Sequence, residues 1–479
     1  MLVWLTTLAL GGPETELPVP CSTPVEWKAV ASPTWPDLPP PPGDLGIRDA
    51  YGVENVETSE HFALWWGPDQ PPTSTQRTRL LDAFETSWAM QIGDMGHTAP
   101  YGTDAYHFNV YVGDTGGGTR ETGRAAGFYS TDPDGWPVIV IGRDTLDRPD
   151  YSDITVAHEF YHAVQGATDR YTYNQTDASA WLWEASATWA SHEVYPDNPG
   201  YAAFLFGYAF HPHLSLDFFD YPNQGVVTEY YQYGAFIFPV HISDRTGSWQ
   251  VIRDVWMDPG DDPDPLAVMT RRLAEDDLDF DTLWLDHIAR NVTWDYPDQE
   301  VYRGVLARYG GLPEAKNGDS VVMPSLGRND WTRGPRDRQP LRYGTNTLVL
   351  PRPLPGQYTV EFKGFELGDL GSVAEIGATL VLPGDPVEYR PMGCENNLCT
   401  GTWDDLEDVP NAYFALGRWS VERGPDWKKE TFPYEYRVTY TSFDVEEPEP
   451  TKKGCGCSGV GSPVGWVWLL MVPLWRRRR

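Results

Sequence analysis

Two histidines and a glutamate at HExxH spacing are the residues of this sequence best suited to chemistry. The motif, HEFYH, runs from His158 to His162. In an α-helix, residues four apart lie on one face, so His158 and His162 can bind the same metal ion. Glu159 is rotated about 100° from His158 and can act on a water molecule beside that metal. Neutral imidazoles suit zinc, and a catalytic zinc needs one further protein ligand and an open position.

The residues around the motif favour a helix. Ser152 and Asp153 are candidate N-caps, apolar residues recur through the segment, and Gly166 is predicted to end it. The alternative interpretation is a buried helix that carries two histidines without a metal.

A lone carboxylate, Glu184, lies in a second predicted helix, Trp181–Ala190, which Asp177 or Ser179 can cap. The segment between His162 and Glu184 is long enough for a loop and a returning helix. A buried, unpaired carboxylate is costly in free energy, and a metal ion would neutralise it. Glu184 is therefore the candidate for the third ligand.

This pattern resembles the gluzincin branch of the zinc metallopeptidases, in which HExxH is followed by a helical W-x-x-E-x-x-A; here Trp181, Glu184 and Ala187 match it. The resemblance implies an α+β, zincin-like metallopeptidase domain with a mixed sheet and helices. It also implies that His158, His162 and Glu184 bind Zn²⁺, with Glu159 as general base. The metzincin pattern is rejected, because residues 163–175 contain no histidine.

The segment Glu229–His241 resembles the part of gluzincins that carries a tyrosine for the transition state. In that family the phenol donates a hydrogen bond to the oxyanion. By position this role falls to Tyr231, with Tyr233 as the alternative; a helix whose aromatic residues only pack is also possible. Pro239 would kink such a helix.

Four other histidines have less specific settings. His61 and His107 lie in strand patterns and are interpreted as packing residues. His211 and His213 are either alternative oxyanion stabilisers or surface residues, and their spacing does not decide between the two.

Residues 56–335 are predicted to form the metallopeptidase domain. A helix begins at Thr73 or Ser74, and residues 248–295 contain further helices around an acidic loop, Asp258–Asp264, interpreted as solvated charge. The predicted strands are His61–Trp66, Tyr106–Val112 and Trp136–Ile141. The resemblance implies that the last of these strands forms the sheet edge along which an extended substrate lies.

Residues 336–445 have a different sequence pattern, in which short runs of strand-forming residues alternate with turn residues. This pattern predicts a small all-β, sandwich-like domain. Cys394 and Cys399 are close enough in sequence to form a local disulfide, which fits an exported protein.

Both ends of the chain carry sorting signals in this interpretation. Residues 1–20 are predicted to be a signal peptide and residues 21–55 a proline-rich linker. Residues 446–479 combine an acidic linker, Cys455 and Cys457, an apolar segment and four terminal arginines. They resemble the myxobacterial C-terminal surface-sorting tag, which implies a cell-surface (outer-membrane) or extracellular protein that meets the membrane only through this segment. A zinc or redox site at the two cysteines is the alternative.

The net charge of the chain bears on the kinds of molecule that it can bind. A formal net charge of −33 argues against nucleic acid, because phosphate binding needs basic patches. The sequence thus predicts a secreted or surface-anchored zinc-dependent endopeptidase that acts on polypeptides. A catalytically inactive zincin-fold adhesion or scaffold protein is the alternative, and a hydrolase of non-peptide amides or esters is a third hypothesis.

Overall fold

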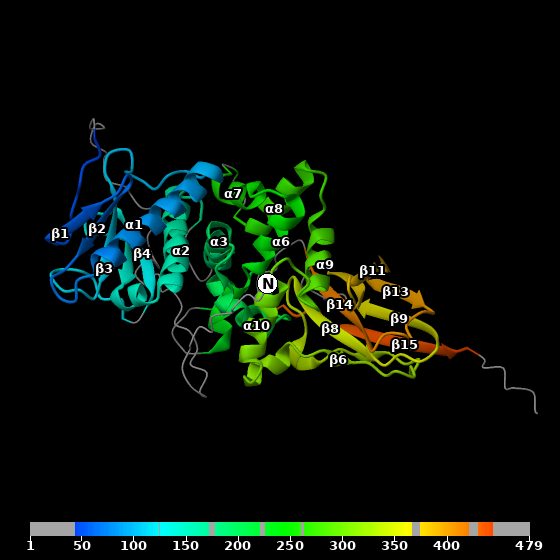
Figure 1. The fold of residues 1–479 in the computed structure, drawn as a ribbon. Helices are drawn as coiled ribbons and strands as arrows, with labels where there is room; N and C mark the ends of the chain where they lie inside the picture. The colour runs from blue at the N-terminus through cyan, green and yellow to red at the C-terminus, as the bar shows by residue number, and fades with distance from the viewer. Residues whose placement is uncertain are drawn as a thin grey trace, which may run out of the picture.

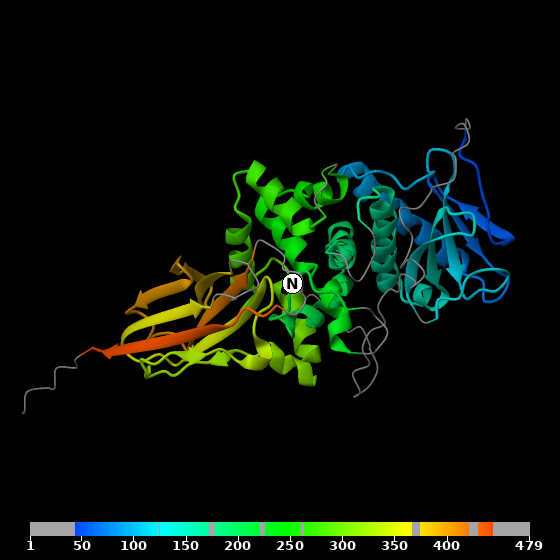
Figure 2. The same cartoon turned by 180° about the vertical axis from the view of Figure 1, so that it is seen from behind.

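The computed structural model describes residues 44–123, 125–171, 178–220, 226–258, 260, 263–365, 374–420 and 430–443. Three parts follow one another along the molecule: an N-terminal sheet with its helices, a central group of helices, and a C-terminal pair of sheets (Figures 1 and 2). The predicted signal peptide and C-terminal tail lie outside the described residues. Within those residues, no helix is long and apolar enough to cross a membrane.

The N-terminal sheet has the strand order β1-β2-β3-β5-β4. Strands β2, β3 and β5 are parallel to one another, whereas β1 and β4 run antiparallel to their neighbours. The parallel strands are apolar and buried along nearly their whole length, as expected where both faces of a sheet are covered. The strands are β1 (Asn55–Thr58), β2 (Phe62–Trp66), β3 (Phe108–Gly113), β4 (Gly127–Thr131) and β5 (Pro137–Gly142).

The three strands predicted from the sequence are confirmed, but the predicted sheet edge is wrong. Strand β5 pairs with β3 on one side and β4 on the other, so it is internal. Pro137 is tolerated there because it is the first residue of the strand. The edge strand beside β5 is β4, which follows a glycine-rich segment and gave no clear alternating pattern.

The helices cover the sheet and then form the middle of the molecule. Thr73 caps α1 with a capping box, as predicted, and α2 packs on β4, β5, α1 and α3. The helices are α1 (Ser74–Trp88), α2 (Pro149–Ala167), α3 (Ala180–Val194), α4 (Leu205–Ala209), α5 (Tyr231–Gly234), α6 (Ile237–Thr246), α7 (Gln250–Met257), α8 (Pro265–Glu275), α9 (Phe280–Asn291) and α10 (Gln299–Tyr309). Pro239 lies in the first turn of α6, where its missing N–H leaves no hydrogen bond unmade.

The C-terminal part consists of two five-stranded sheets, β11-β10-β14-β8-β6 and β12-β13-β9-β15-β7, which share one apolar core. Its strands are β6 (Val321–Val322), β7 (Thr332–Arg333), β8 (Gly344–Pro351), β9 (Gly356–Gly364), β10 (Glu375–Leu382), β11 (Glu388–Pro391), β12 (Gly393–Glu395), β13 (Leu398–Trp403), β14 (Asn411–Trp419) and β15 (Tyr434–Ser442). A disulfide joins Cys394 to Cys399 across β12 and β13.

Two predicted domain boundaries differ from the structure. The sandwich begins at β6 rather than at residue 336, because β6 and β7 already pair with β8 and β15. Part of the predicted linker belongs to the first domain: Arg48 forms an ion pair with Asp132 at 2.6 Å, and Gly46 bridges to Tyr106. At the coarser level the α+β prediction is confirmed.

Candidate metal centre

The HExxH motif lies in the middle of α2, where the helix is buried on all sides. The helix begins at Pro149, about one turn before the predicted caps Ser152 and Asp153. Proline suits this first position because an initial helical N–H has no partner within the helix. At the other end, α2 passes Gly166 and ends at Ala167. A side chain at Gly166 would meet the Tyr129 hydroxyl, so close packing explains this glycine better than helix termination does.

The second helix, α3, brings Glu184 to the two histidines. Ser179 is its N-cap residue, although its side chain makes no capping hydrogen bond. Asp177, the other predicted cap, lies outside the described residues. Glu184 has no exposed surface and His158 is 5% exposed, so the three side chains meet in the interior.

The three predicted ligand atoms form a compact triangle. His158 Nε2 lies 3.1 Å from His162 Nε2 and 3.1 Å from Glu184 Oε2, and His162 Nε2 lies 3.5 Å from the same oxygen. Ligands at about 2.05 Å from a tetrahedral zinc ion are separated from one another by about 3.3 Å. The triangle therefore has the size of one face of such a coordination tetrahedron, and the cluster could hold a metal ion.

The ring orientation of His162 also suits metal binding. Its Nδ1 lies 2.7 Å from Gln165 Oε1, and Gln165 Nε2 donates to the Trp183 carbonyl and the Ser186 hydroxyl, both at 2.9 Å. Because the amide nitrogen of Gln165 is thus occupied, its oxygen faces the histidine and accepts the Nδ1 proton. The lone pair of His162 Nε2 is then directed into the triangle, as a metal ligand requires.

Neighbouring polar groups of α3 complete the surroundings of the cluster. Thr188 Oγ1 lies 3.5 Å from His158 Nδ1, and Trp256 Nε1 donates to Ser186 Oγ at 3.1 Å. Sequence reasoning missed Gln165, Ser186 and Thr188 as positioning residues. Their signal was available, because each is a polar residue on a helix that is otherwise apolar and buried.

The pKa of Glu184 differs from that expected of a buried carboxylic acid. Burial alone would raise the pKa of Glu184, but the His162 and His158 rings outweigh it and lower that pKa to about 2. For His162, burial would lower the pKa, and the Glu184 carboxylate instead raises it to about 8. The carboxylate is therefore ionised at neutral pH and offers a negatively charged ligand.

Glu159 is fully buried beside the edge strand β4. A Cβ atom on Gly127 would lie 3.2 Å from Glu159 Cγ, so strand and side chain are in contact. The Glu159 carboxylate also contributes to the raised pKa of His162. The motif glutamate thus lies next to the cluster without being one of its three ligand atoms.

The two candidate tyrosines occupy different positions. The Tyr231 ring contacts Tyr208 and Phe218, and its hydroxyl donates to the Leu214 carbonyl at 3.4 Å. The Tyr233 ring stacks on His158, with the ring centroids 5.9 Å apart. The tyrosine seen next to the cluster is therefore Tyr233, the alternative, rather than Tyr231.

The remaining predicted histidines pack elsewhere. His61 Nδ1 lies 2.7 Å from Glu85 Oε2 and its ring stacks on Trp88, as expected of a packing residue. His211 Nδ1 donates to the Gly207 carbonyl at 3.1 Å. Burial lowers the pKa of His213 to about 4 and also lowers that of His107. Among the described residues, none of these four joins the metal-binding cluster.

The solved structures that this chain matches include a distant one. One match is a family GH115 4-O-methyl-α-glucuronidase with specificity for decorated arabinogalactans, at 8% sequence identity and a TM-score of 0.14. It covers 62% of this chain, and this chain spans 39% of that enzyme. A similarity at this level carries no argument about fold or activity. Comparison with curated proteins gives no match.

Family membership is clearer. Residues 43–378, which include the first sheet, the central helices and the His-His-Glu cluster, match one family model. The match covers well over half of the sequence, so the chain belongs to DUF6055, a family of unknown function.

Proposed function

We propose that this chain is a zinc-dependent endopeptidase of the gluzincin type, with a zincin-like domain formed by the N-terminal sheet and the helices that follow it. The observation that carries the proposal is the triangle of His158 Nε2, His162 Nε2 and Glu184 Oε2, with sides of 3.1 to 3.5 Å. Glu159, the carboxylate of the motif, lies beside it. Zinc is favoured because two imidazoles and one carboxylate are the protein ligands of known zinc peptidases.

The residues of the chain would divide the work of hydrolysis. A zinc ion at this cluster would supply Lewis acidity, which polarises a carbonyl and lowers the pKa of water to about 7. Glu159 would take the proton from the attacking water and deliver it to the leaving amine nitrogen. Gln165 would hold His162 in the tautomer that keeps Nε2 free of a proton. Tyr233 would donate a hydrogen bond to the oxyanion.

The substrate would lie along β4. The gluzincin resemblance associates an extended substrate with the edge of the sheet, and β4 is the edge strand next to the motif. Gly127 of this strand lies against Glu159, which brings the edge close to the proposed general base.

Export is a further part of the proposal. The disulfide between Cys394 and Cys399 supports it, since disulfides persist in oxidising compartments. The sequence signals for a signal peptide and a surface-sorting tag agree with a protein that faces the outside of the cell.

One observation favours a second function. The cluster is almost completely buried: Glu159 and Glu184 have no exposed surface and His162 is 1% exposed. A metal held in this way can stabilise a fold without turnover, as in an adhesion or scaffold protein that keeps a zincin fold.

Cleavage of casein and of a peptide library by the purified, zinc-loaded protein separates the two functions. The peptidase proposal predicts cleavage that a chelator abolishes and zinc restores. Glu159→Gln should slow cleavage at least about 100-fold while zinc remains bound, because it removes only the base. Glu193→Gln, a carboxylate change at the far end of α3, is the matched control and should leave cleavage intact. Absence of cleavage by the zinc-loaded protein, or an active Glu159→Gln variant, would contradict the proposal.

The choice between the two tyrosines needs its own experiment. Tyr233→Phe should lower kcat about 100-fold with little change in KM, because an oxyanion donor acts in the transition state. Tyr231→Phe should leave kcat nearly unchanged, since its hydroxyl contacts a backbone carbonyl away from the cluster. The opposite result would return the role to Tyr231.

A further inference from the structure

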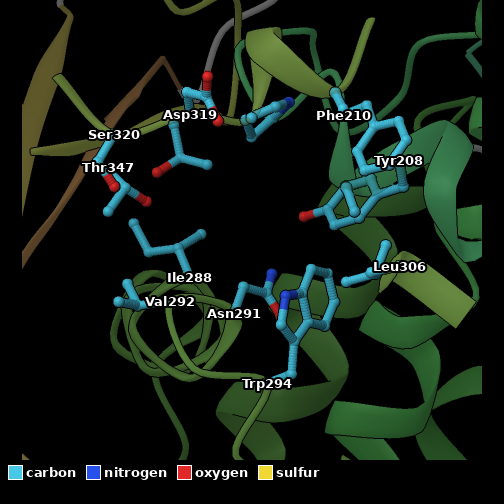
Figure 3. Close-up of a pocket in the computed structure, with 15 residues that line it drawn as sticks. Tyr208, Phe210, Ile288, Asn291, Val292, Trp294, Leu306, Asp319, Ser320 and Thr347 are labelled. Carbon is cyan, nitrogen blue, oxygen red and sulfur yellow. The ribbon is translucent and has the colours of Figure 1, made fainter. Parts of the chain in front are cut away.

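A cavity of about 180 Å³ lies between the central helices and the C-terminal sandwich, apart from the metal-binding cluster. Its walls come from α4, from α9 and the turn after it, from α10, from the segment that leads into β6, and from β8. Ligand sites often lie at such junctions between two structural units. The polar and large aromatic side chains on which the argument depends are Tyr208, Asn291, Trp294, Asp319, Ser320 and Thr347 (Figure 3).

The lining of this cavity excludes several ligand classes. Among the residues that the structure describes, its lining contains no lysine, arginine or histidine, so none of these side chains would neutralise a phosphate or a carboxylate. Hydroxyl, amide and carboxylate groups interrupt the apolar surface, which does not suit a lipid chain. The volume is below that of the pockets which enclose drug-sized ligands. A small, neutral molecule with both an apolar face and several hydroxyl groups fits these conditions.

Hydrogen-bonding side chains that are held in place by a buried histidine form one wall of the cavity. His287 is fully buried, and burial lowers its pKa far below the usual value, so the ring is neutral. Its Nδ1 lies 2.9 Å from the hydroxyl of Tyr296, which itself donates to Asn291 Oδ1 at 2.7 Å, so Nδ1 carries the proton. His287 Nε2 then accepts one hydrogen bond, yet Tyr208 Oη and Asn291 Nδ2 lie 3.0 and 3.1 Å away. The Tyr208 hydroxyl and the Asn291 amide also form a hydrogen bond with each other, so His287, Tyr208 and Asn291 make one polar group at the cavity wall.

Figure 3 shows where these groups point. The Tyr208 hydroxyl and the side chain of Asn291 are directed toward the same open space, and Asp319, Ser320 and Thr347 lie around its other side. A ligand between them would meet donors on one side and a carboxylate and hydroxyls on the other. This arrangement suits a molecule with hydroxyl groups around its whole circumference.

The backbone conformation at Trp294 supports the interpretation of this cavity as a binding site. Its φ is +57°, a left-handed conformation that is unfavourable for a large side chain. Two arginines hold the turn: Arg303 donates to the Thr293 carbonyl at 2.7 and 2.9 Å, and Arg290 donates to the Asp295 carbonyl at 3.1 Å. Such strain is often kept where it presents a side chain for function. Here it presents an indole to the cavity, against which the C–H face of a sugar ring can stack.

We propose that this cavity binds a single pyranose ring, as a free sugar or as the end of a glycan, with Trp294 as the stacking surface and Tyr208, Asn291 and Asp319 as hydroxyl partners. This binding site does not depend on the proposed peptidase activity, and its ligand would be bound in addition to the peptide substrate. The site would join the central helices to the sandwich, since Thr347 belongs to β8 and the other named residues do not.

Saturation-transfer NMR and calorimetry with methyl glycosides of glucose, galactose, mannose, xylose and N-acetylglucosamine test this proposal on the full protein. We expect saturable binding of at least one of them, with a dissociation constant on the order of 1 mM, as is usual for a ligand of this size. Trp294→Asn should weaken it at least 10-fold, because asparagine accepts the left-handed backbone but removes the indole. Thr347→Val, which keeps the shape of the side chain, should weaken it several-fold.

Matched controls make the outcome decisive. Trp331→Asn, in the sandwich and away from the cavity, should bind the sugar as the native protein does. Glu159→Gln should also bind it normally, which separates this proposal from the peptidase proposal. The proposal is overturned if the folded protein binds none of the glycosides, if Trp294→Asn and Thr347→Val leave binding unchanged, or if tetramethylammonium binds in their place. That last result would identify the aromatic residues and Asp319 as a cation site.

Discussion

Two buried pairs of histidines have similar distances between their rings but different chemical surroundings. On α2, the His158 and His162 rings are 4.7 Å apart; between α6 and α9, the His241 and His287 rings are 5.3 Å apart. The first pair shares a fully buried carboxylate, Glu184. The second pair is surrounded mainly by neutral groups, and its nearest carboxylate, Asp286, lies 3.4 Å from His241 and is also paired with two arginines.

The surroundings of the two pairs shift the pKa of a histidine in opposite directions. Glu184 raises the pKa of His162 to about 8 in spite of burial, whereas burial lowers the pKa of His241 to about 3. Two imidazoles in an apolar interior are therefore not enough to predict a metal site. A buried anion that converges on both ring nitrogens makes the difference, and its removal should have the largest effect.

The largest expected effect is that of Glu184→Ala on metal affinity. Structural zinc sites with four ligands bind with roughly 10–16 kcal/mol, so the loss of one ligand should weaken binding about 10²- to 10³-fold. Asp286→Ala, the corresponding change at the second pair, should leave zinc affinity unchanged. Competition with a zinc-sensitive chelating dye measures both, and equal losses in the two variants would remove the distinction.

The next largest effect should come from the second pair. His287→Leu removes the group that organises Tyr208, Asn291 and Tyr296, and it takes away the imidazole that accepts a hydrogen bond from the buried Tyr208 hydroxyl. We expect the free energy of unfolding to fall by about 2–3 kcal/mol, with zinc content unchanged. Urea denaturation measures the loss, and a variant of native stability that has lost its zinc would show that the pairs have been assigned the wrong way round.

A smaller effect on metal affinity is expected from Gln165→Leu. Loss of the hydrogen bond to His162 Nδ1 should weaken zinc binding about 10- to 100-fold, as is typical of groups that orient a ligand. Gln165→Glu keeps the acceptor for His162 but sets a carboxylate oxygen against the Trp183 carbonyl, so it should recover only part of the affinity. If the leucine variant bound zinc as tightly as the native protein, the tautomer of His162 would not depend on Gln165.

The smallest expected effect is on the pH dependence of stability, and it comes from a single histidine, His192, that lies between two carboxylates. His192 lies 2.9 Å from Glu193 and 3.2 Å from Asp298; burial would lower its pKa, but these carboxylates raise it to about 9. Because the folded pKa exceeds the ordinary value of 6.5, this stabilisation is complete below pH 6.5 and is lost as the pH rises through 9. Partial exposure of Asp298 reduces it to about 1–2 kcal/mol.

Urea denaturation of the native protein and of His192→Gln at several pH values checks this prediction. The difference in unfolding free energy should be largest at pH 6 and should vanish near pH 10. A difference that stays constant or grows with pH would show that His192 is not held in its charged form.

Part of the fold and of the site could be predicted from sequence because the signals are local. The HExxH motif and Glu184 lie in strongly apolar helices, and the three parallel strands of the first sheet are rich in apolar residues. Strand β4 and the position of β5 inside the sheet were not predictable in this way, because they depend on pairing between distant segments. Tyr233 acquires its position only when α5 packs near His158, which no spacing along the chain encodes. Gln165 lies three residues from His162 on the same helix, but its orientation depends on Trp183 and Ser186 of α3.

The central claim is that one metal ion binds where α2 and α3 meet. Anomalous diffraction at the zinc absorption edge, from crystals of zinc-loaded protein, tests it most directly. The account predicts a single strong peak within about 2.0–2.2 Å of His158 Nε2, His162 Nε2 and a Glu184 carboxylate oxygen. A zinc-loaded crystal with no peak between these three side chains, or with its peak at other residues, would contradict it.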